Sequence, residues 1–485
     1  MDIMNRTDTI YASNENVIGV LTDSEIHLIS IVQGKRALRS TLLPAEANNP
    51  SGLFAFLWQA GLTAVWVMPG SNLSRTVMCS WFEQARPSWV VVTHDDPQKP
   101  SRPRSAFLWP KGSGQREARR LTFVFPENAG WEWIVSDAKS LLATVTYLDQ
   151  ILSRPLIDSP DLVARQLLND CLPDQPPTQL HPLPTELLTL LGKNKSMSSH
   201  VEEDTHDPLL PLPTNKAQRP WMRSLTLAEQ RQRYLHKYIH LFRDVEACMA
   251  VRLGTGTVSH SSTGRAYDGI RPGLWRVQAE LAGSLFDGKH LPHGLSGEWM
   301  STPEVKCCQD ISYQVSVQEG YYWPQSYEPL TLWAKTLWEA AERVHLHPQS
   351  YRNAQGRANA FQTLKQLAQR GMTILAQDEQ EGGWARPDWW TQIVGRSRAI
   401  LFTQLASLVR RGTMPVLVDR DALWVVSDDP NPLTAVRGLI TAQRWKGYMV
   451  GYEVPLPLSH EVKAAFRTSG QPEQAAIALD TLAEV

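Results

Sequence analysis

The first third of the chain contains short apolar runs separated by polar turns. Residues 17–21 and 26–32 are two such runs on either side of a polar turn, a pattern typical of paired strands. In residues 137–152, apolar side chains instead recur every three or four positions, which predicts an amphipathic helix. We also expect strands at 34–43, 64–68, 89–93, 107–110 and 121–125, the last two as a hairpin, and a helix at 53–58.

In this region strands come first, and strands then mix with helices. This order predicts an α/β domain, which we assign to residues 1–172. The order resembles the ribonuclease H-like fold, which is also the fold of the proofreading exonuclease that precedes the palm in family B DNA polymerases. The resemblance implies an exonuclease-like N-terminal domain.

The next segment, residues 173–220, is polar and rich in proline. It has almost no apolar periodicity and cannot bury enough surface to offset its ordering entropy. We therefore interpret it as a flexible linker that contains one short helix at 187–191.

The second half of the chain predicts an α+β domain with a mainly antiparallel sheet. We assign residues 221–460 to this domain and residues 461–485 to a C-terminal tail. We expect helices at 227–238, 330–345, 359–369 and 388–411, and strands at 273–280, 312–318, 416–418, 423–426 and 448–454.

Composition excludes several classes of protein. The 485 residues are 42% hydrophobic and 20% charged, as in ordinary globular proteins, and the net charge of -1 leaves DNA contacts to local clusters. Five scattered cysteines favour a reducing compartment over a zinc site. The N-terminus lacks the apolar core of a signal peptide, and no run reaches the ~20 apolar residues of a membrane span, so we expect a cytoplasmic protein.

Asp419-Arg420-Asp421 is the most informative segment, because it places two acids between the apolar runs 416–418 and 423–426. Nucleotidyl transfer uses two metal ions about 3.5–4 Å apart, and magnesium prefers oxygen ligands. A strand hairpin would hold such carboxylates rigidly. The alternative is an ordinary hairpin whose turn is acidic.

Several segments in sequence order resemble the palm and fingers of family B DNA polymerases. The acidic hairpin resembles their Tyr-x-Asp-Thr-Asp-Ser hairpin, and residues 384–401 resemble the helix that leads to it from the fingers. Residues 273–277, 297–304 and 315–323 resemble a palm stretch of the protein-primed branch.

The family resemblance also implies roles for single residues. Asp419 and Asp421 take the positions of magnesium ligands, and Lys365 lies where the fingers helix contacts the incoming triphosphate. The Asn-Ser-x-Tyr-Gly continuation of that helix is absent here. A solvated lysine on a helix is the alternative for Lys365.

One catalytic carboxylate of the family pattern is replaced. In that pattern a strand near the start of the palm ends in Tyr-Asp or Phe-Asp, and Ile239 takes the aspartate position here. Isoleucine cannot ligate a metal, and Asp244 or Glu246 substitutes only if the local register differs. Losing one metal ligand removes most activity, and a ~10⁴-fold loss of rate corresponds to about 5.5 kcal/mol of barrier. We therefore expect a degenerate palm.

The acids of the N-terminal domain allow a similar comparison. Asp23 and Glu25 have the Asp-x-Glu spacing of a proofreading site but fall on a turn, with Asp95, Asp96, Asp137 and Asp149 as candidate partners. The alternative is that these are turn and helix-cap acids, and we expect a non-catalytic relative of the exonuclease.

A second resemblance concerns residues 131–168 together with the palm stretch. These segments are similar to telomere-associated and mobile-element proteins of linear actinobacterial replicons. That resemblance implies work in the replication or end maintenance of a replicon or mobile element, alongside a terminal protein or another replication protein.

Basic residues cluster locally despite the neutral total. One cluster lies within residues 99–120, and two others are interleaved with tryptophans that suit stacking on unpaired bases. The candidate DNA contacts in those two are Arg219, Arg223, Arg231, Arg233 and Lys237, and then Arg386, Arg396, Arg398 and Trp389. Solvated surface is the alternative for each cluster.

Three functions remain open from the sequence. The leading interpretation is a DNA-binding protein derived from a family B polymerase, with impaired catalysis and no required cofactor. The second is an active magnesium-dependent polymerase or nucleotidyltransferase that uses Asp419, Asp421 and Asp244 as its carboxylates. The third is a scaffold that holds a replication partner.

Overall fold

A computed structural model describes most of the chain. The described residues are 18–32, 35–69, 75–96, 99–111, 120–126, 130–131, 133, 135–152, 156, 159–172, 183–192, 221–281, 294–311, 313–346, 354–377, 386–419, 422–436, 440–441, 444–445, 448–452, 454–468 and 472–483. The chain forms two compact units, and the first is discontinuous: it comprises residues 1–168 and 339–371, whereas the second comprises residues 169–338 and 372–485.

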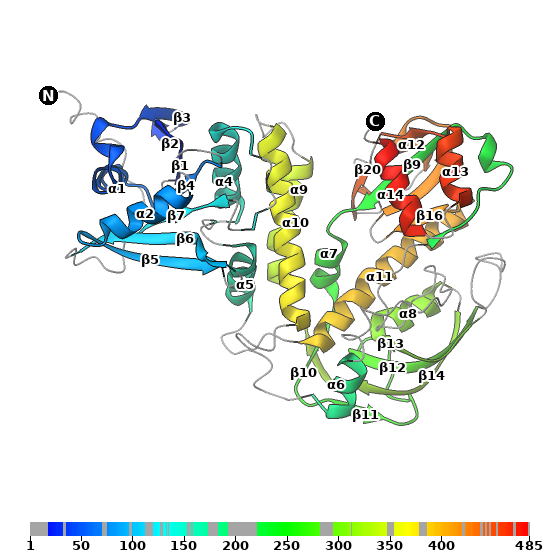
Figure 1. Ribbon diagram of the computed structural model, residues 1–485. Helices are drawn as coiled ribbons and strands as arrows, with labels where there is room; N and C mark the ends of the chain where they lie inside the picture. The colour runs from blue at the N-terminus through cyan, green and yellow to red at the C-terminus, as the bar shows by residue number, and fades with distance from the viewer. Residues whose placement is uncertain are drawn as a thin grey trace. The chain divides into compact units, whose positions relative to one another are not determined.

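In the described part of the first unit, seven strands form one sheet in the order β3-β2-β1-β4-β7-β6-β5 (Figure 1). β1, β2 and β3 are antiparallel, β1, β4 and β7 are parallel, and β7, β6 and β5 are antiparallel again. The strands are β1 Ile18–Leu21, β2 Glu25–Val32, β3 Lys35–Leu42, β4 Ala64–Val67, β5 Trp89–Asp96, β6 Lys99–Pro110 and β7 Leu121–Val124. All the strands predicted for this domain are confirmed.

Helices cover this sheet and enclose an aromatic core. Phe54 of α1 lies 5.8 Å from Phe82 of α2 and 5.4 Å from Phe123 of β7, measured between ring centroids. The helices α1 Pro50–Gln59 and α4 Ala138–Leu152 match the predicted ones, whereas α2 Arg75–Ala85 and α5 Pro160–Cys171 were not predicted as helices.

The first unit is completed by residues from the predicted fingers region. Trp133 donates its indole N–H to Thr363 Oγ1 at 2.6 Å, and Arg370 pairs with Asp161 at 3.4 Å. Thr363 and Arg370 lie on α10 Ala354–Gln377, which follows α9 Thr331–Leu346. The division predicted at residue 172 therefore does not separate all of the second half of the chain from the first.

The second unit contains two larger sheets within its described residues. The larger sheet has the order β18-β19-β20-β9-β17-β16-β8, with β21 also on β9, and the second sheet has the order β11-β14-β12-β13. The strands of the larger sheet are β8 Trp221–Met222, β9 Tyr234–His240, β16 Leu417–Asp419, β17 Ala422–Ser427, β18 Ile440–Thr441, β19 Arg444–Trp445, β20 Tyr448–Tyr452 and β21 Leu456–Pro457. The remaining strands are β10 Leu253–Thr255, β11 Ser259–Ser261, β12 Gly273–Leu281, β13 Gly294–Ser301, β14 Tyr313–Tyr322 and β15 Gln325–Tyr327.

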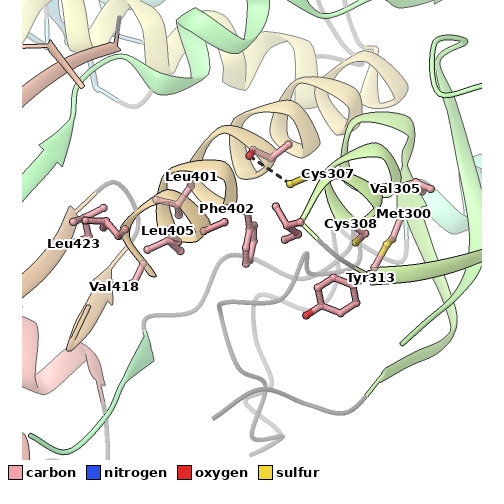
Figure 2. Packing of buried hydrophobic residues seen from close by; sticks show 14 of the residues in the cluster. Met300, Val305, Cys307, Cys308, Tyr313, Leu401, Phe402, Leu405, Val418 and Leu423 are labelled. Carbon is pink, nitrogen blue, oxygen red and sulfur yellow. Dashed lines mark hydrogen bonds between the residues drawn. The ribbon is translucent and has the colours of Figure 1, made fainter. Parts of the chain in front are cut away.

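Helix α11, Pro387–Arg410, packs against elements of both sheets. Figure 2 shows Leu401, Phe402 and Leu405 of α11 in one buried cluster that also contains Val418 and Leu423 of the β16–β17 hairpin. The same cluster reaches α8 Thr302–Asp310, where the Cys307 thiol donates to the Ala399 carbonyl at 3.5 Å. The other helices are α6 Thr185–Gly192, α7 Arg243–Ala250, α12 Pro432–Ala435, α13 His460–Thr468 and α14 Pro472–Ala483.

Two predictions for this half of the chain are wrong. The helix predicted at 227–238 is a 3-10 turn at Glu229–Arg231 followed by strand β9, because burial alternates along β9 between its two faces. The predicted tail at 461–485 forms α13 and α14, whose Phe466 and Leu479 join the core beneath Trp424. The short helix predicted near 187–191 is confirmed as α6, and most of the predicted linker lies outside the described residues.

Within the described part of the chain, no helix has the length and apolar character that crossing a membrane requires.

A glycine fixes how closely α11 approaches α8. A Cβ at Gly395 would lie 1.9 Å from Ser301 Oγ, whereas a Cβ at Gly356 of α10 would make an ordinary 3.5 Å contact with Ala143. We expect Gly395→Ala to lower the free energy of unfolding by about 1–3 kcal/mol through overpacking. Gly356→Ala, the matched control, should raise it by up to about 1 kcal/mol, because alanine favours the helix. Urea denaturation measures both, and a stabilised Gly395→Ala variant would refute the close approach.

Candidate functional site

The acidic hairpin and the strand beside it define the candidate site. Leu417 pairs with Trp424 and Asp419 with Ala422, and the two residues between the paired strands lie outside the described part of the chain. Ala422 in turn pairs with Ile239 of β9, and Ile239 pairs with Gly451 of β20. Asp419, Ala422, Ile239 and Gly451 therefore form one row across this sheet.

Residues in one row project from the same face of a sheet. Adjacent strands lie about 4.8 Å apart, so the positions of Asp419 and Ile239 are separated by roughly 10 Å, with Ala422 between them. Ile239, which takes the place of the family's aspartate, therefore lies in the same row as Asp419, called here the acid-bearing row. Asp421 and the side chain of Asp419 lie outside the described residues, so their metal-ligand roles stay predictions.

The face that carries this row also carries Lys237, two positions before Ile239. The Lys237 ammonium lies 2.6 Å from Asp480 Oδ1 of α14 and 5.1 Å from the centre of the Trp424 ring. Its side chain is only 13% exposed. Lys237 is thus held between a carboxylate and an aromatic face, and it links β9 to the C-terminal helix α14.

The opposite face of β9 carries a buried histidine that sequence reasoning missed. His240, the last residue of β9, lies with Nε2 3.1 Å from Glu246 Oε2 and with Nδ1 3.0 Å from Gln404 Nε2 of α11. Phe242 follows in the left-handed region, at φ 56° and ψ 32°, and allows α7 to begin directly after the strand. The available signal was a histidine directly after Ile239, with a glutamate six residues later.

Asp244 and Glu246, the two substitutes considered for the missing carboxylate, lie in the first turn of α7. Glu246 is engaged by His240, and Asp244 is exposed. Acids in the first helical turn also interact favourably with the helix dipole, which gives both residues a structural role.

Among the described residues, no group of three or more histidine, cysteine or acidic side chains is placed to hold a metal ion. Ala422 and Ile239, which pair in the same row as Asp419, have no side-chain oxygen that could bind magnesium. Magnesium binding by Asp419 and Asp421 stays a prediction.

Several predicted DNA-contacting side chains are buried and bonded inside the second unit. Arg223 donates to both carboxylate oxygens of Glu229, at 2.8 and 2.5 Å, and Arg398 donates to Glu304 at 3.1 Å. Burial alone would raise the pKa of Glu229, but the hydrogen bonds from Arg223 and from the backbone N–H of Thr226 lower it overall.

Arg386 and Trp389 have the same character, because both donate to the Gly254 carbonyl, at 3.0 and 2.8 Å. Arg386 also pairs with Asp388 at 2.6 Å. Internal bonds thus account for the conformations of Arg223, Arg386, Arg398 and Trp389. The prediction of DNA contacts then depends on the exposed cations.

Exposed cations of the second unit lie near the start of β9. Arg231 and Arg233 are exposed, and Arg233 is 3.9 Å from the carboxylate of Asp428. Arg467 of α13, not singled out from the sequence, is also exposed and donates to Gln230 at 3.5 Å. Arg396 is half-buried on α11, and Arg219 lies outside the described residues.

Lys365 lies on the exposed side of α10, in the part of that helix that belongs to the first unit. The hairpin belongs to the second unit. The triphosphate contact of Lys365 therefore stays a prediction.

In the first unit, Asp137 acts as a helix cap. Its carboxylate accepts from the Ser140 backbone N–H at 2.8 Å and from the Ser140 hydroxyl at 2.9 Å. The hydrogen bond from the Ser140 backbone is the main cause that lowers the pKa of Asp137. Asp137 therefore has the role of a helix-cap acid, which was the alternative to a role in a proofreading site.

The comparisons with known proteins add a likeness in fold. No family model and no curated protein matches the sequence. Among solved structures, the chain is similar to phi29 DNA polymerase complexed with primer-template DNA, at a TM-score of 0.44 and 8% identity, covering 91% of this chain and 85% of that one.

Another similar structure is the family B DNA polymerase of the hyperthermophilic archaeon Pyrobaculum calidifontis. Its TM-score is 0.35 at 9% identity, and the match covers 97% of this chain and 65% of the polymerase. The chain is thus a mixed α/β protein whose structural neighbours include DNA polymerases. At these scores, the likeness concerns the course of the chain and gives no residue a role.

The cap at Asp137 predicts a pH-dependent contribution to stability. Because the folded-state pKa of Asp137 is lowered, its contribution is present above the unfolded value of about 3.9 and is lost as the pH falls through the folded value. We expect Asp137→Ala to lower the free energy of unfolding by about 1 kcal/mol at pH 7, with a smaller difference near pH 3.

Asp137→Asn is the control, since asparagine caps a helix without titrating in this range. Urea unfolding at both pH values measures the effect. An equal loss at pH 7 and pH 3 for Asp137→Ala would show that the carboxylate charge has no part in the cap.

Proposed function

We propose that this protein is a DNA-binding protein derived from a family B DNA polymerase, with impaired nucleotidyl transfer. The observation that carries the proposal is the row Asp419–Ala422–Ile239, in which isoleucine stands where the polymerase pattern has its second carboxylate. A polymerase palm is expected to have an acid-bearing hairpin beside the strand that supplies the second carboxylate. Here that strand is β9, and Ile239 replaces the carboxylate.

The size of the defect follows from the chemistry. A two-metal mechanism stabilises the attacking and leaving oxygens together, and it needs carboxylates that bridge the two ions. An aliphatic side chain supplies no ligand, and a ~10⁴-fold loss of rate corresponds to about 5.5 kcal/mol. Magnesium would be needed only if activity survives through Asp421 and Asp244.

Binding to DNA is supported by the exposed arginines near the start of β9. Arg231, Arg233 and Arg467 present guanidinium groups that suit phosphate oxygens. The proposed partner is single-stranded or primer-template DNA, and Arg219, Arg396 and Lys365 are further proposed contacts. The buried Arg223, Arg386, Arg398 and Trp389 are bonded to other groups of the protein.

The first unit supports the same proposal as a non-catalytic relative of an exonuclease with a ribonuclease H-like fold. Its elements are three antiparallel strands, a helix, β4 parallel to β1, a second helix, and then β5 and β6, which are antiparallel, before β7, which is parallel to β4. Asp137, one of its candidate acids, is engaged in capping α4.

The biological setting is also proposed. We place the protein in replication or end maintenance of a replicon or mobile element, with a terminal protein or replication protein as partner. All five cysteines are free thiols, in keeping with the cytoplasmic location that we propose.

The proposed binding should depend steeply on salt. If about six phosphates are contacted, the log-log slope of the association constant against salt concentration should be near -5 for duplex and about -4 for single-stranded DNA. Arg231→Gln combined with Arg233→Gln should make the slope less negative by about 2, since two phosphate contacts are lost.

Fluorescence anisotropy with labelled primer-template DNA measures the slope. Arg276→Gln is the control, because Arg276 is an exposed arginine of β12 that pairs with Glu319. Salt-independent affinity, or no affinity for primer-template, hairpin or single-stranded DNA, would overturn the binding proposal.

Impaired catalysis is tested by primer extension with magnesium. We expect the wild-type protein to extend a labelled primer no faster than Asp421→Ala, because the acid-bearing row lacks its second carboxylate. Gel analysis of single-turnover reactions measures this. Clear extension by the wild-type protein that Asp421→Ala abolishes would establish an active polymerase and contradict the proposal.

A further inference from the structure

The second unit contains a pocket away from the acidic hairpin. Its volume is about 220 Å³, and four segments line it: the chain after α7, the loop before β12, the start of α8 and the middle of α11. Ligand pockets for drug-sized molecules are typically about 300–1,000 Å³, so this one suits a smaller group.

Charge in the pocket has one sign. Arg252, Lys306 and Arg396 line it, and the lining formed by the described residues includes no carboxylate. The nearby Asp268 is engaged by Arg271 at 3.1 Å and by the backbone N–H groups of Ile270 and Arg271, both at 2.8 Å. The Arg252 guanidinium also donates to the Ser326 carbonyl at 3.4 Å. Three cations along one pocket attract an anion, and guanidinium groups match the geometry of a phosphate.

Two polar atoms of the lining lack partners among the described residues. These are Nε of Arg396 and Oε1 of Gln392, both buried from solvent. Gln392 is 1% exposed, and its Nε2 donates to the Gly273 carbonyl at 2.8 Å, which fixes Oε1 as the unpartnered acceptor. Because both atoms are closed to solvent, a ligand in the open volume of the pocket does not reach them, and the three cations set what the pocket attracts.

Backbone groups at the start of α8 contribute little to this preference. Ser301 and Glu304 form a capping box, and Pro303 has no N–H. The Thr302 hydroxyl donates to the Arg271 carbonyl at 2.6 Å and accepts from Trp275 at 2.8 Å. The side chains of Arg252, Lys306 and Arg396 therefore determine what the pocket takes.

We propose that this pocket binds a phosphate group, either of a free nucleotide or of the terminal nucleotide of a DNA strand. The phosphate meets the three cations. The site does not depend on Asp419 or Asp421. It shares Arg396 with the DNA contacts proposed above, so the strand-end case rests on that proposed function, whereas the free-nucleotide case does not.

Isothermal titration of the full-length protein with deoxyadenosine 5′-monophosphate tests the pocket. We expect both this nucleotide and inorganic phosphate to bind, because the phosphate group is what the three cations meet. Arg396→Gln should weaken this binding about tenfold or more and Lys306→Gln about threefold, with the larger effect at the less exposed cation. Arg410→Gln, an exposed arginine on the same helix outside the pocket, should leave the affinity unchanged.

A second arm compares a short oligonucleotide with and without a 5′-phosphate. If only the phosphorylated strand binds more tightly, and Lys306→Gln removes that preference, the ligand is a strand end. If the monophosphate binds and the strand shows no preference, the ligand is a free nucleotide. No binding of either probe, or affinities that Lys306→Gln and Arg396→Gln leave unchanged, would overturn the proposal. Because Lys306 is exposed, its variant should fold even if Arg396→Gln does not.

Discussion

Burial of helix α11 is the constraint on which the second unit depends. The helix buries residues on several sides along its length, including polar ones such as Asp388, Gln392, Ser397, Arg398 and Gln404. Such groups are tolerated in a core only when hydrogen-bonded, and the bonds found here join α11 to distant segments of the chain. Gln392 bonds to the start of β12, Arg398 to α8 and Gln404 to the end of β9.

This polar bonding also fixes where the candidate site lies. Leu401 and Leu405 of α11 pack under the β16–β17 hairpin, and a shift of the helix along its axis would break the bonds at Gly273, Glu304 and His240 together. Desolvation raises the pKa of Glu304 even though Arg398 and Ser301 oppose that shift, so the bond to Arg398 offsets a real burial cost. Helix α11 thus fixes the position of the β16–β17 hairpin and also supplies Arg398, the cation that pairs with the buried Glu304.

Much of this architecture could be predicted from periodicity. Short apolar runs identified β1, β4, β16 and β17, because each is bounded by polar turn residues, and α11 was predicted to end where Gly412 adopts φ 79°. Strand β9 was predicted as a helix, since its alternation depends on burying His236 and His240, which sequence patterns treat as polar. The partners of His240, on α7 and α11, come from 6 and 164 residues away, and no local rule anticipates the second.

The discontinuity of the first unit has a consequence for how the protein is made. Trp133 reaches its partner Thr363 only after the segment that contains Thr363 has been synthesised. The ribosome must extend the chain from residue 168 to residue 371 before the unit is complete. At about 5–20 residues per second this takes roughly 10–40 s. During that interval Trp133, whose ring stacks on Trp131 at 5.3 Å between centroids, lacks the hydroxyl that accepts its indole N–H.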